Sequence, residues 1–218
     1  MPGLLNCNIG DLNKINYECG NCKTCNPTSN LVYPFERNLT TSETLVEELK
    51  YSIEKNTNYR CEPTTILKNP DICVINKNND KIICRTEAKY LEGKAFMKAE
   101  KILGLKPKET LVVDGPKLIS YFECDENDFK ELGYHVPIFI VWKFDRPCQD
   151  IGGICVYQNI DVLHTIYRQK GYERTFTRQR GEGDIVSRFE LGIRDKYHFS
   201  IKECKPIENL ISEILSIP

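Results

Sequence analysis

Residues 69–89, NPDICVINKNNDKIICRTEAK, form the stretch that decides the fold. Two apolar runs, residues 72–75 and 81–89, flank a short segment of Asn, Lys and Asp at 76–80. Asn and Asp tolerate left-handed backbone and bond to their own chain, so this segment predicts a tight turn between two strands. We therefore expect a β-hairpin here.

Three charged side chains belong to one end of this hairpin. Strand side chains alternate between two faces, so Glu87 and Lys89 point the same way. A hairpin also places the start of one strand beside the end of the other, which brings Asp71 near Glu87. Two carboxylates this close repel each other unless a cation lies between them, and Mg²⁺ or Mn²⁺ suits such oxygen ligands. Lys89 would then hold or deprotonate an attacking water, or neutralise charge on phosphorus.

Pro70-Asp71 followed by Glu87-Ala88-Lys89 resembles the motif of the PD-(D/E)xK nuclease superfamily, which includes many type II restriction endonucleases. The resemblance implies that Asp71 and Glu87 hold a metal and that Lys89 assists the water. The motif is short, and its context supports it because both halves lie in apolar runs with a helical pattern on either side. The ordinary alternative is a solvated hairpin with a surface ion pair.

Members of this superfamily commonly carry one further acidic residue on the helix before the hairpin. Residues 40–56 predict that helix, with Thr40 as its cap and an apolar stripe along one side. Glu47 is the candidate acid, with Glu43 and Glu48 as alternatives on the flank of the stripe. For each of them a solvated charge is the ordinary alternative.

The elements after the hairpin complete the expected core. Residues 91–103 predict a second helix, and residues 110–113 a buried strand. A second apolar run follows at 117–122, ahead of an acidic connection with a short helical piece. Residues 136–142, VPIFIVW, are the most apolar run and predict a central strand. The order implies an α/β fold with a restriction-endonuclease-like core, in which helices flank a central mixed β-sheet.

Composition limits the class of protein. The chain has 218 residues, 40% of them hydrophobic, with a formal net charge of −1, so any DNA-binding surface must be local. No apolar run is long enough to span a membrane, and no signal peptide is evident, so we expect a cytoplasmic protein. Residues 31–218 are expected to form the nuclease domain, after a Cys-rich segment at residues 1–30.

That segment carries a metal-binding pattern. Cys19, Cys22 and Cys25 form a C-x2-C-x2-C run, and Cys7 could supply a fourth thiolate. Zn²⁺ is the first choice, and an iron–sulfur cluster or cysteines without metal are the alternatives. The chain has eleven cysteines, an odd number, and lacks a secretory signal. Reduced cysteines and one metal cluster therefore fit better than a disulfide framework.

Residues 168–188 form a candidate DNA-contacting arm. Arg174, Arg178 and Arg180 give a local basic density in which aromatic residues are interleaved. Lys94, just beyond the hairpin, could reach a phosphate near the metal. The alternatives are an Arg-rich surface hairpin paired with its own acids, and a solvated helix charge at Lys94.

We therefore expect a Mg²⁺-dependent endonuclease that acts on double-stranded DNA, in a restriction-type role. Cutting both strands calls for two active sites, which favours a homodimer. One alternative is a non-enzymatic, metal-stabilised nucleic-acid-binding protein. Another is the same chemistry on RNA, branched DNA or a transposition intermediate.

Overall fold

The predicted hairpin is the centre of the structure, a computed structural model. Strands β2 (Ile72–Asn76) and β3 (Ile82–Glu92) pair antiparallel, with a register shift between Val74 and Ile75. Asp80 lies in the turn with φ of 57°, the left-handed conformation that the Asn- and Asp-rich segment predicts. The hairpin is thus present where the sequence predicts it.

The structure describes residues 5, 7–8, 11–19, 35–66, 68–92, 95–145, 150–177, 185–186, 189–190 and 195–218. For residues 35–40, 185–186 and 189–190 this covers the backbone only. Across these ranges, no helix has the length and apolar character needed to cross a lipid bilayer.

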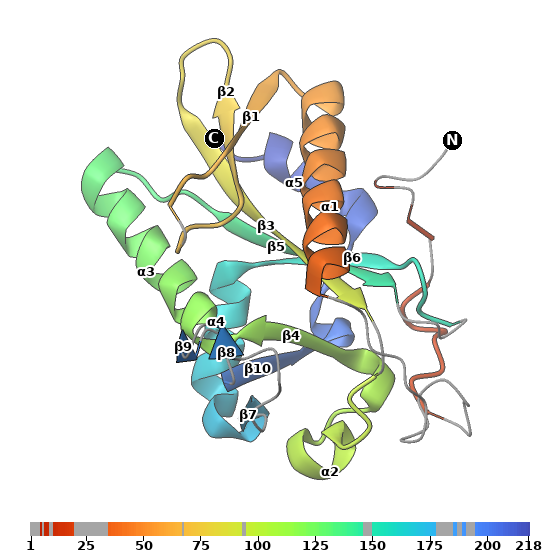
Figure 1. The fold of residues 1–218 in the computed structure, drawn as a ribbon. Helices are drawn as coiled ribbons and strands as arrows, with labels where there is room; N and C mark the ends of the chain where they lie inside the picture. Colours follow the sequence, from red (N-terminus) through yellow and green to blue (C-terminus); the bar gives the residue numbers. More distant parts are fainter. Residues whose placement is uncertain are drawn as a thin grey trace.

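A mixed six-stranded sheet surrounds the hairpin (Figure 1), in the order β1-β2-β3-β5-β6-β11. Strand β3 runs parallel to β5, and the other neighbouring pairs are antiparallel. The most apolar run of the sequence is β5, which lies inside the sheet as predicted. The remaining strands of this sheet are β1 (Tyr59–Pro63), β5 (Ile138–Asp145), β6 (Cys155–Asn159) and β11 (Lys205–Pro206).

One face of the sheet is covered by α1 (Phe35–Asn56) and α5 (Leu210–Leu215). Leu45, Leu49 and Ile53 of α1 are almost fully buried there, at the four-residue spacing of one helix face. Burying each such side chain contributes about 1.5–3 kcal/mol to folding. Helix α1 begins before the predicted Thr40 cap, because residues 35–39, FERNL, contain no helix breaker.

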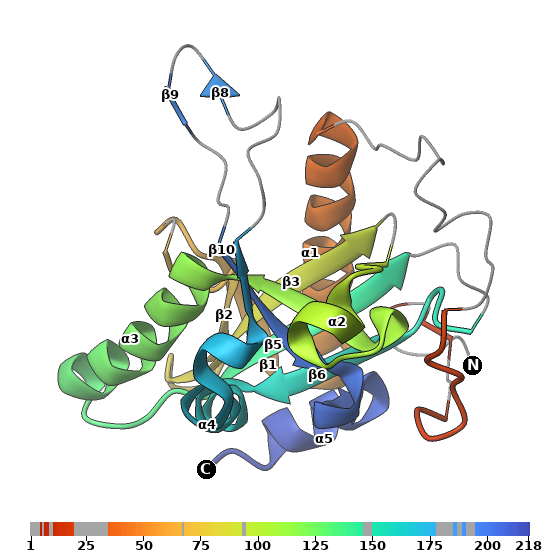
Figure 2. The same ribbon diagram turned by 90° about the horizontal axis from the view of Figure 1, so that it is seen from below.

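The opposite face packs against α3 (Gly115–Leu132), α4 (Ile160–Lys170) and a three-stranded sheet in the order β4-β10-β7. Trp142 and Phe144 of β5 are fully buried in this second core. Figure 2 shows the short β8–β9 hairpin standing away from the body, on the same side as the N-terminal end of α1. The remaining elements are α2 (Ala99–Leu103), β4 (Thr110–Asp114), β7 (Thr175–Thr177), β8 (Ile185–Val186), β9 (Phe189–Glu190) and β10 (Asp195–Ser200).

The helix predicted at residues 91–103 is wrong over most of its length. Strand β3 continues through Glu92, and its last residues pair with β5, where Leu91 lies opposite Phe144. Only Ala99–Leu103 is helical, and Gly104 ends it in the left-handed conformation at φ of 67°. Pairing with a buried neighbour strand outweighs the local helical pattern.

The apolar run at residues 117–122 is helical, contrary to the interpretation of a separate run before an acidic connection. Both stretches belong to α3, whose first turn contains Pro116, a favoured residue there. Leu118, Tyr121 and Phe122 are buried at the three- and four-residue spacing of one helix face. Of the acidic residues that follow, Glu123 and Glu126 are exposed on the outer side of the same helix, whereas Asp128 is buried. This long helix connects the small sheet back to β5.

Candidate active site

The candidate site lies where β3 extends beyond β2. The register of β2 against β3 ends with Ile72 opposite Thr86, whereas β3 pairs with β5 as far as Glu92. On the side that β2 leaves open, the Ala88 amide donates a hydrogen bond of 2.9 Å to Oδ2 of Asp71. The Asp71 side chain thus takes the place of the missing strand neighbour, and this contact fixes the carboxylate at the end of the hairpin.

Glu87 lies next to Asp71 in this gap. The Asp71 amide donates to Oε2 of Glu87 over 3.2 Å, and only 1% of the Glu87 side chain is exposed. The structure therefore brings the two carboxylates together, as the hairpin geometry predicts. Buried carboxylates need partners, because an uncompensated charge is costly to remove from water.

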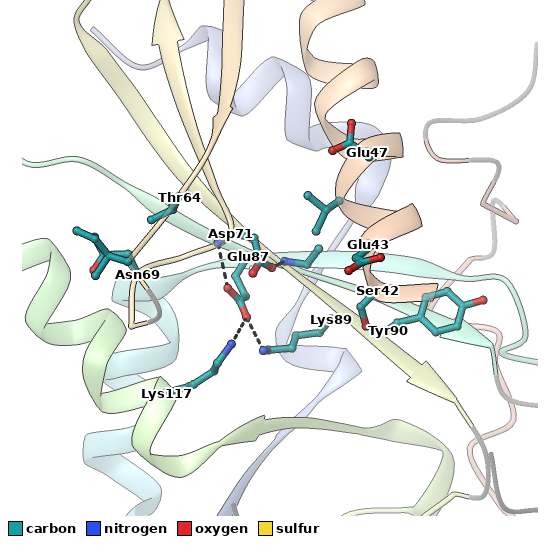
Figure 3. Close-up of a pocket in the computed structure, with 13 residues that line it drawn as sticks. Ser42, Glu43, Glu47, Thr64, Asn69, Asp71, Glu87, Lys89, Tyr90 and Lys117 are labelled. Carbon is teal, nitrogen blue, oxygen red and sulfur yellow. Dashed lines mark hydrogen bonds and ion pairs between the residues drawn. The ribbon is translucent and has the colours of Figure 1, made fainter. Parts of the chain in front are cut away.

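Two ammonium groups supply those partners, and Figure 3 shows them reaching Glu87 from different elements. Lys89 of β3 donates to Oε1 of Glu87. The Nζ atom of Lys117, from the first turn of α3, lies 3.6 Å from the same oxygen. Asp71, Glu87, Lys89 and Lys117 thus form a four-residue group, called here the open cluster.

The charges of the open cluster shift its acidities in opposite directions. Burial and the neighbouring Glu87 charge raise the pKa of Asp71 to about 6. Burial alone would also raise the pKa of Glu87, but the Lys89 and Lys117 ammoniums hold it below its usual range. Burial would lower the pKa of Lys89, yet the contact with Glu87 raises it. Lys89 is therefore a charged ammonium in this state.

A cavity of about 740 Å³ opens onto the cluster. Its walls come from the N-terminal half of α1, from the β1–β2 connection and from α3 (Figure 3). Ile66 of the connection is 59% exposed and Val46 of α1 also lines the cavity, so the cavity has apolar as well as charged walls. The volume suits a small part of a polymer, such as one or two nucleotides.

Glu47, the predicted helix acid, lines this cavity without joining the cluster. Its carboxylate accepts a hydrogen bond of 2.9 Å from Lys50 of the same helix, and its side chain is 70% exposed. Glu43, one turn earlier, also lines the cavity. Glu48 faces elsewhere and pairs with Lys143 over 2.8 Å.

The donor set of the cluster fits a small divalent cation. Within the described ranges, no three His, Cys, Asp or Glu side chains are grouped closely enough to hold a metal ion by themselves. Asp71 and Glu87 nevertheless present adjacent carboxylates whose mutual repulsion raises the pKa of Asp71, and a cation between them would relieve it. Mg²⁺ commonly binds one or two carboxylates and keeps waters or phosphate oxygens as its other ligands.

Sequence reasoning missed the two residues that α3 contributes. Lys117 and Tyr121 lie one turn apart on the face of α3 that meets β3. The Tyr121 hydroxyl is fully buried near Glu87, and burial together with that carboxylate charge raises the pKa of the phenol. Pro116 as a helix-start signal, followed by a 3.6-residue apolar pattern, could have placed both side chains toward the sheet.

The N-terminal cysteines depart from the expected metal set. Cys7 forms a disulfide with Cys155, across 148 residues of sequence, which removes Cys7 as a thiolate ligand. The Asn8 amide donates to the Gly153 carbonyl over 2.8 Å and so aligns the two segments. The expectation that the cysteines avoid disulfides is wrong for this pair. Cys19 is partly buried, while Cys22 and Cys25 lie outside the described residues.

Arg174, a residue of the candidate DNA-contacting arm, is buried in the structure. Its side chain is 10% exposed and its guanidinium donates to Glu203 over 3.1 Å. An ion pair this deeply buried leaves the guanidinium little exposed surface for a contact with DNA. Arg178, Arg180 and Lys94 lie outside the described residues.

The comparisons with known proteins give structural neighbours but no family. No protein-family model matches the chain, and no curated protein matches it. One solved neighbour is a Holliday junction resolvase from Archaeoglobus fulgidus, at 7% identity and a TM-score of 0.39, covering 79% of this chain and 96% of that one. Another is a nuclease from a fusselovirus, at 10% identity and a TM-score of 0.42, covering 85% and 95%. Nucleases are thus among the structural neighbours, while the site is assigned from its own geometry alone.

Proposed function

We propose that this protein is a metal-dependent nuclease that hydrolyses phosphodiester bonds of DNA. One observation carries the proposal: Asp71 and Glu87 meet at the open end of β3 with the Lys89 ammonium beside them, at the floor of a cavity. Two carboxylates and a lysine in this arrangement can bind a divalent cation and a phosphate together. The PD-(D/E)xK motif that the sequence resembles carries the same residue types.

Asp71 and Glu87 would hold the cation in this mechanism. A Mg²⁺ or Mn²⁺ ion there supplies polarisation of a phosphate oxygen and lowers the pKa of a water. The hydrogen bond from the Ala88 amide orients Asp71, so the carboxylate is in place before substrate arrives.

Lys89 would act as a cation toward the reacting phosphate. Contact with Glu87 raises the pKa of Lys89, so the ammonium keeps its proton at neutral pH. It can orient a water by donating to it and can stabilise the negative charge that develops on the phosphorus oxygens. The raised pKa disfavours proton abstraction by Lys89, because a lysine must be neutral to accept a proton.

Double-stranded DNA is the proposed substrate, with a restriction-type role as the first choice. The cavity is lined by acidic as well as apolar side chains, and the net charge is −1, so phosphate contacts must come from few, local cations. Branched DNA and RNA are the alternatives that a substrate panel separates. A single site per chain would need a second copy of the chain to cut both strands, and sedimentation with and without duplex tests that homodimer.

The first experiment is cleavage of supercoiled plasmid, random duplex, a four-way junction and RNA with Mg²⁺ or Mn²⁺. Asp71→Ala, Glu123→Ala on the outer side of α3, and an EDTA arm serve as controls. Metal-dependent fragments that vanish in Asp71→Ala and persist in Glu123→Ala support the nuclease. Binding without any cleavage, or cleavage that Asp71→Ala retains, contradicts it.

A zinc site at Cys19, Cys22 and Cys25 remains a separate proposal, with a fourth ligand other than Cys7. The C-x2-C-x2-C spacing supports it. Elemental analysis of the purified protein beside a Cys22→Ser, Cys25→Ser variant tests it. A wild-type protein with neither zinc nor iron contradicts the proposal.

A further inference from the structure

The open cluster carries a balanced set of charges before any cation or substrate binds. The side chains of Asp71 and Glu87 face those of Lys89 and Lys117, and both ammoniums are directed at a single oxygen, Oε1 of Glu87. A divalent cation that uses this carboxylate must compete with both ammoniums. In the cation-free protein, the two lysines therefore occupy the Glu87 oxygen that a cation would use.

The two lysines hold Glu87 unequally. Lys89 is in hydrogen-bond contact with Oε1, and 19% of its side chain is exposed. Lys117 is 3.6 Å from the same oxygen, beyond hydrogen-bond length, and 34% of its side chain is exposed. Lys117 also lines the cavity in which a substrate would lie. It is the ammonium that can leave Glu87 at the smaller cost.

The position of Lys117 is set by a rigid support. Arg85, two residues before Glu87 on the same face of β3, makes a bidentate ion pair with Asp128 of α3, each contact 2.7 Å long. Asp128 lies three helical turns beyond Lys117, so the pair fixes α3 against β3 at one end. At the other end, Gly115 lies beside Asp195 of β10, and a Cβ added there would be in ordinary van der Waals contact with the Asp195 carbonyl oxygen, at 3.4 Å.

The first turn of α3 adds to this placement. The helix has 18 residues, and Lys117, which lines the cavity, lies in its first turn (Figure 3). Unpaired amides and the helix dipole make such an end electropositive. An anion in the cavity would thus meet positive potential from α3, opposite the acidic side chains of α1.

We propose that Lys117 exchanges partners in the reaction cycle. It holds Glu87 in the cation-free protein, and it binds a non-bridging oxygen of the scissile phosphate once Glu87 is engaged by a divalent cation. Lys117 is then a second catalytic cation beside Lys89, reaching the phosphate from the α3 side. The proposal rests on the nuclease function and adds to it a residue outside the motif.

The test separates two consequences of removing this ammonium. Lys117→Gln removes a cation that competes for Glu87, so Mn²⁺ should bind roughly two- to fivefold more tightly, the effect of losing a partly exposed ion pair. The same change should slow single-turnover cleavage about 10²-fold at saturating Mn²⁺, as for loss of one transition-state donor. A role in structure alone would not tighten the binding of Mn²⁺ while cleavage slows.

Lys130→Gln is the matched control, since it removes the same charge from the exposed outer side of α3. Lys117→Arg is the second variant, and it should recover much of the cleavage because it keeps the positive charge. Calorimetric titration with Mn²⁺ needs no DNA, and duplex affinity in Ca²⁺ should change little because one phosphate contact is lost among several. Circular dichroism and thermal unfolding verify that each variant is folded.

The outcomes are distinct. Tighter Mn²⁺ binding with slower cleavage in Lys117→Gln alone supports the exchange. Unchanged cleavage, weaker Mn²⁺ binding, or effects equal to those of Lys130→Gln overturn it while leaving the nuclease in place. A wild-type protein that binds Mn²⁺ and cuts no substrate overturns the proposed function, and the exchange with it.

Discussion

Arg85 and Glu87 lie two residues apart on the same face of β3, and their surroundings differ in kind. Arg85 pairs with Asp128 through two contacts of 2.7 Å, and each side chain is about a tenth exposed, at 11% and 8%. Glu87 is more deeply buried, yet it shares one oxygen between two lysines and lies against a second carboxylate. The first arrangement is a closed pair, and the second is the open cluster.

The charges of the closed pair support the structure, whereas those of the open cluster are placed for chemistry. In the closed pair, the planar guanidinium matches the carboxylate. The hydrogen bonds to Asp128 and its negative charge raise the pKa of Arg85 further above its already high value, although burial acts in the opposite direction. In the open cluster, burial and the Glu87 charge raise the pKa of Asp71, and a cavity opens over both carboxylates. Perturbed acidities beside a cavity are typical of functional sites, whereas a matched buried pair is typical of a support.

The largest expected effect is on catalysis. Lys89→Ala removes the cation that is in contact with Glu87, so cleavage should fall roughly 10³- to 10⁴-fold. Duplex binding in Ca²⁺ should persist, because the carboxylates that hold the cation remain. Single-turnover kinetics and a filter-binding titration measure the two quantities. Cleavage at the wild-type rate would exclude Lys89 from the mechanism.

The next largest effect is a loss of stability when the closed pair of Arg85 and Asp128 is broken. Asp128→Ala leaves the Arg85 guanidinium buried without its partner, which should lower the free energy of unfolding by about 3–5 kcal/mol. Urea unfolding measures this loss, and Glu131→Ala on the exposed side of α3 is the matched control. Arg85→Met combined with Asp128→Leu should recover most of the loss, because it removes both charges. If Asp128→Ala unfolds at the wild-type urea concentration, the pair is not a support.

The smallest expected effect is a gain in stability, which follows from a change at Asp71. The folded-state pKa of Asp71 is about 6 against an ordinary value of 3.8, so the folded protein binds this proton more tightly than the unfolded chain. Stability is therefore lost as pH rises from about 4 to about 6. Asp71→Asn should remove this loss and raise the free energy of unfolding at pH 8, with cations chelated, by roughly 1–3 kcal/mol.

Glu87→Gln provides the contrast for that measurement. The pKa of Glu87 is lowered, so its stabilising contribution is present above the unfolded value of 4.5 and is lost as pH falls. Glu87→Gln should therefore destabilise the protein at pH 8, where Asp71→Asn stabilises it. Urea unfolding at pH 4 and pH 8 measures the direction in which each variant changes the free energy of unfolding. Equal shifts in the two variants would contradict an asymmetric cluster.

The parts of the site that sequence could predict are those close together along the chain. Asp71, Glu87 and Lys89 belong to one hairpin, so strand alternation and a turn suffice to bring them together. Lys117 reaches them only because α3 folds back across the sheet, and the sequence interpretation treated residues 117–122 as a separate apolar run. The disulfide of Cys7 with Cys155 joins segments 148 residues apart, which no local pattern indicates.

The elements of the core also divide into those that a local sequence pattern predicts and those that depend on distant parts of the chain. The central strand β5 is predictable because a run as apolar as residues 136–142 must be buried on both faces. The extension of β3 through Glu92 is not, because it depends on a parallel neighbour about fifty residues later in the chain. Arg174 shows the same limit, since its burial depends on Glu203.

The hydrogen bond from the Ala88 amide to Asp71 makes this amide a spectroscopic reporter. A ladder amide bonds to a carbonyl whose charge is fixed, whereas this amide bonds to a carboxylate that can take up a proton or engage a cation. Its nuclear magnetic resonance frequency should respond to both events, while neighbouring amides of β3 that bond to carbonyls stay nearly constant. Labelled protein would thus report occupancy of the site at one resonance, without substrate and without turnover.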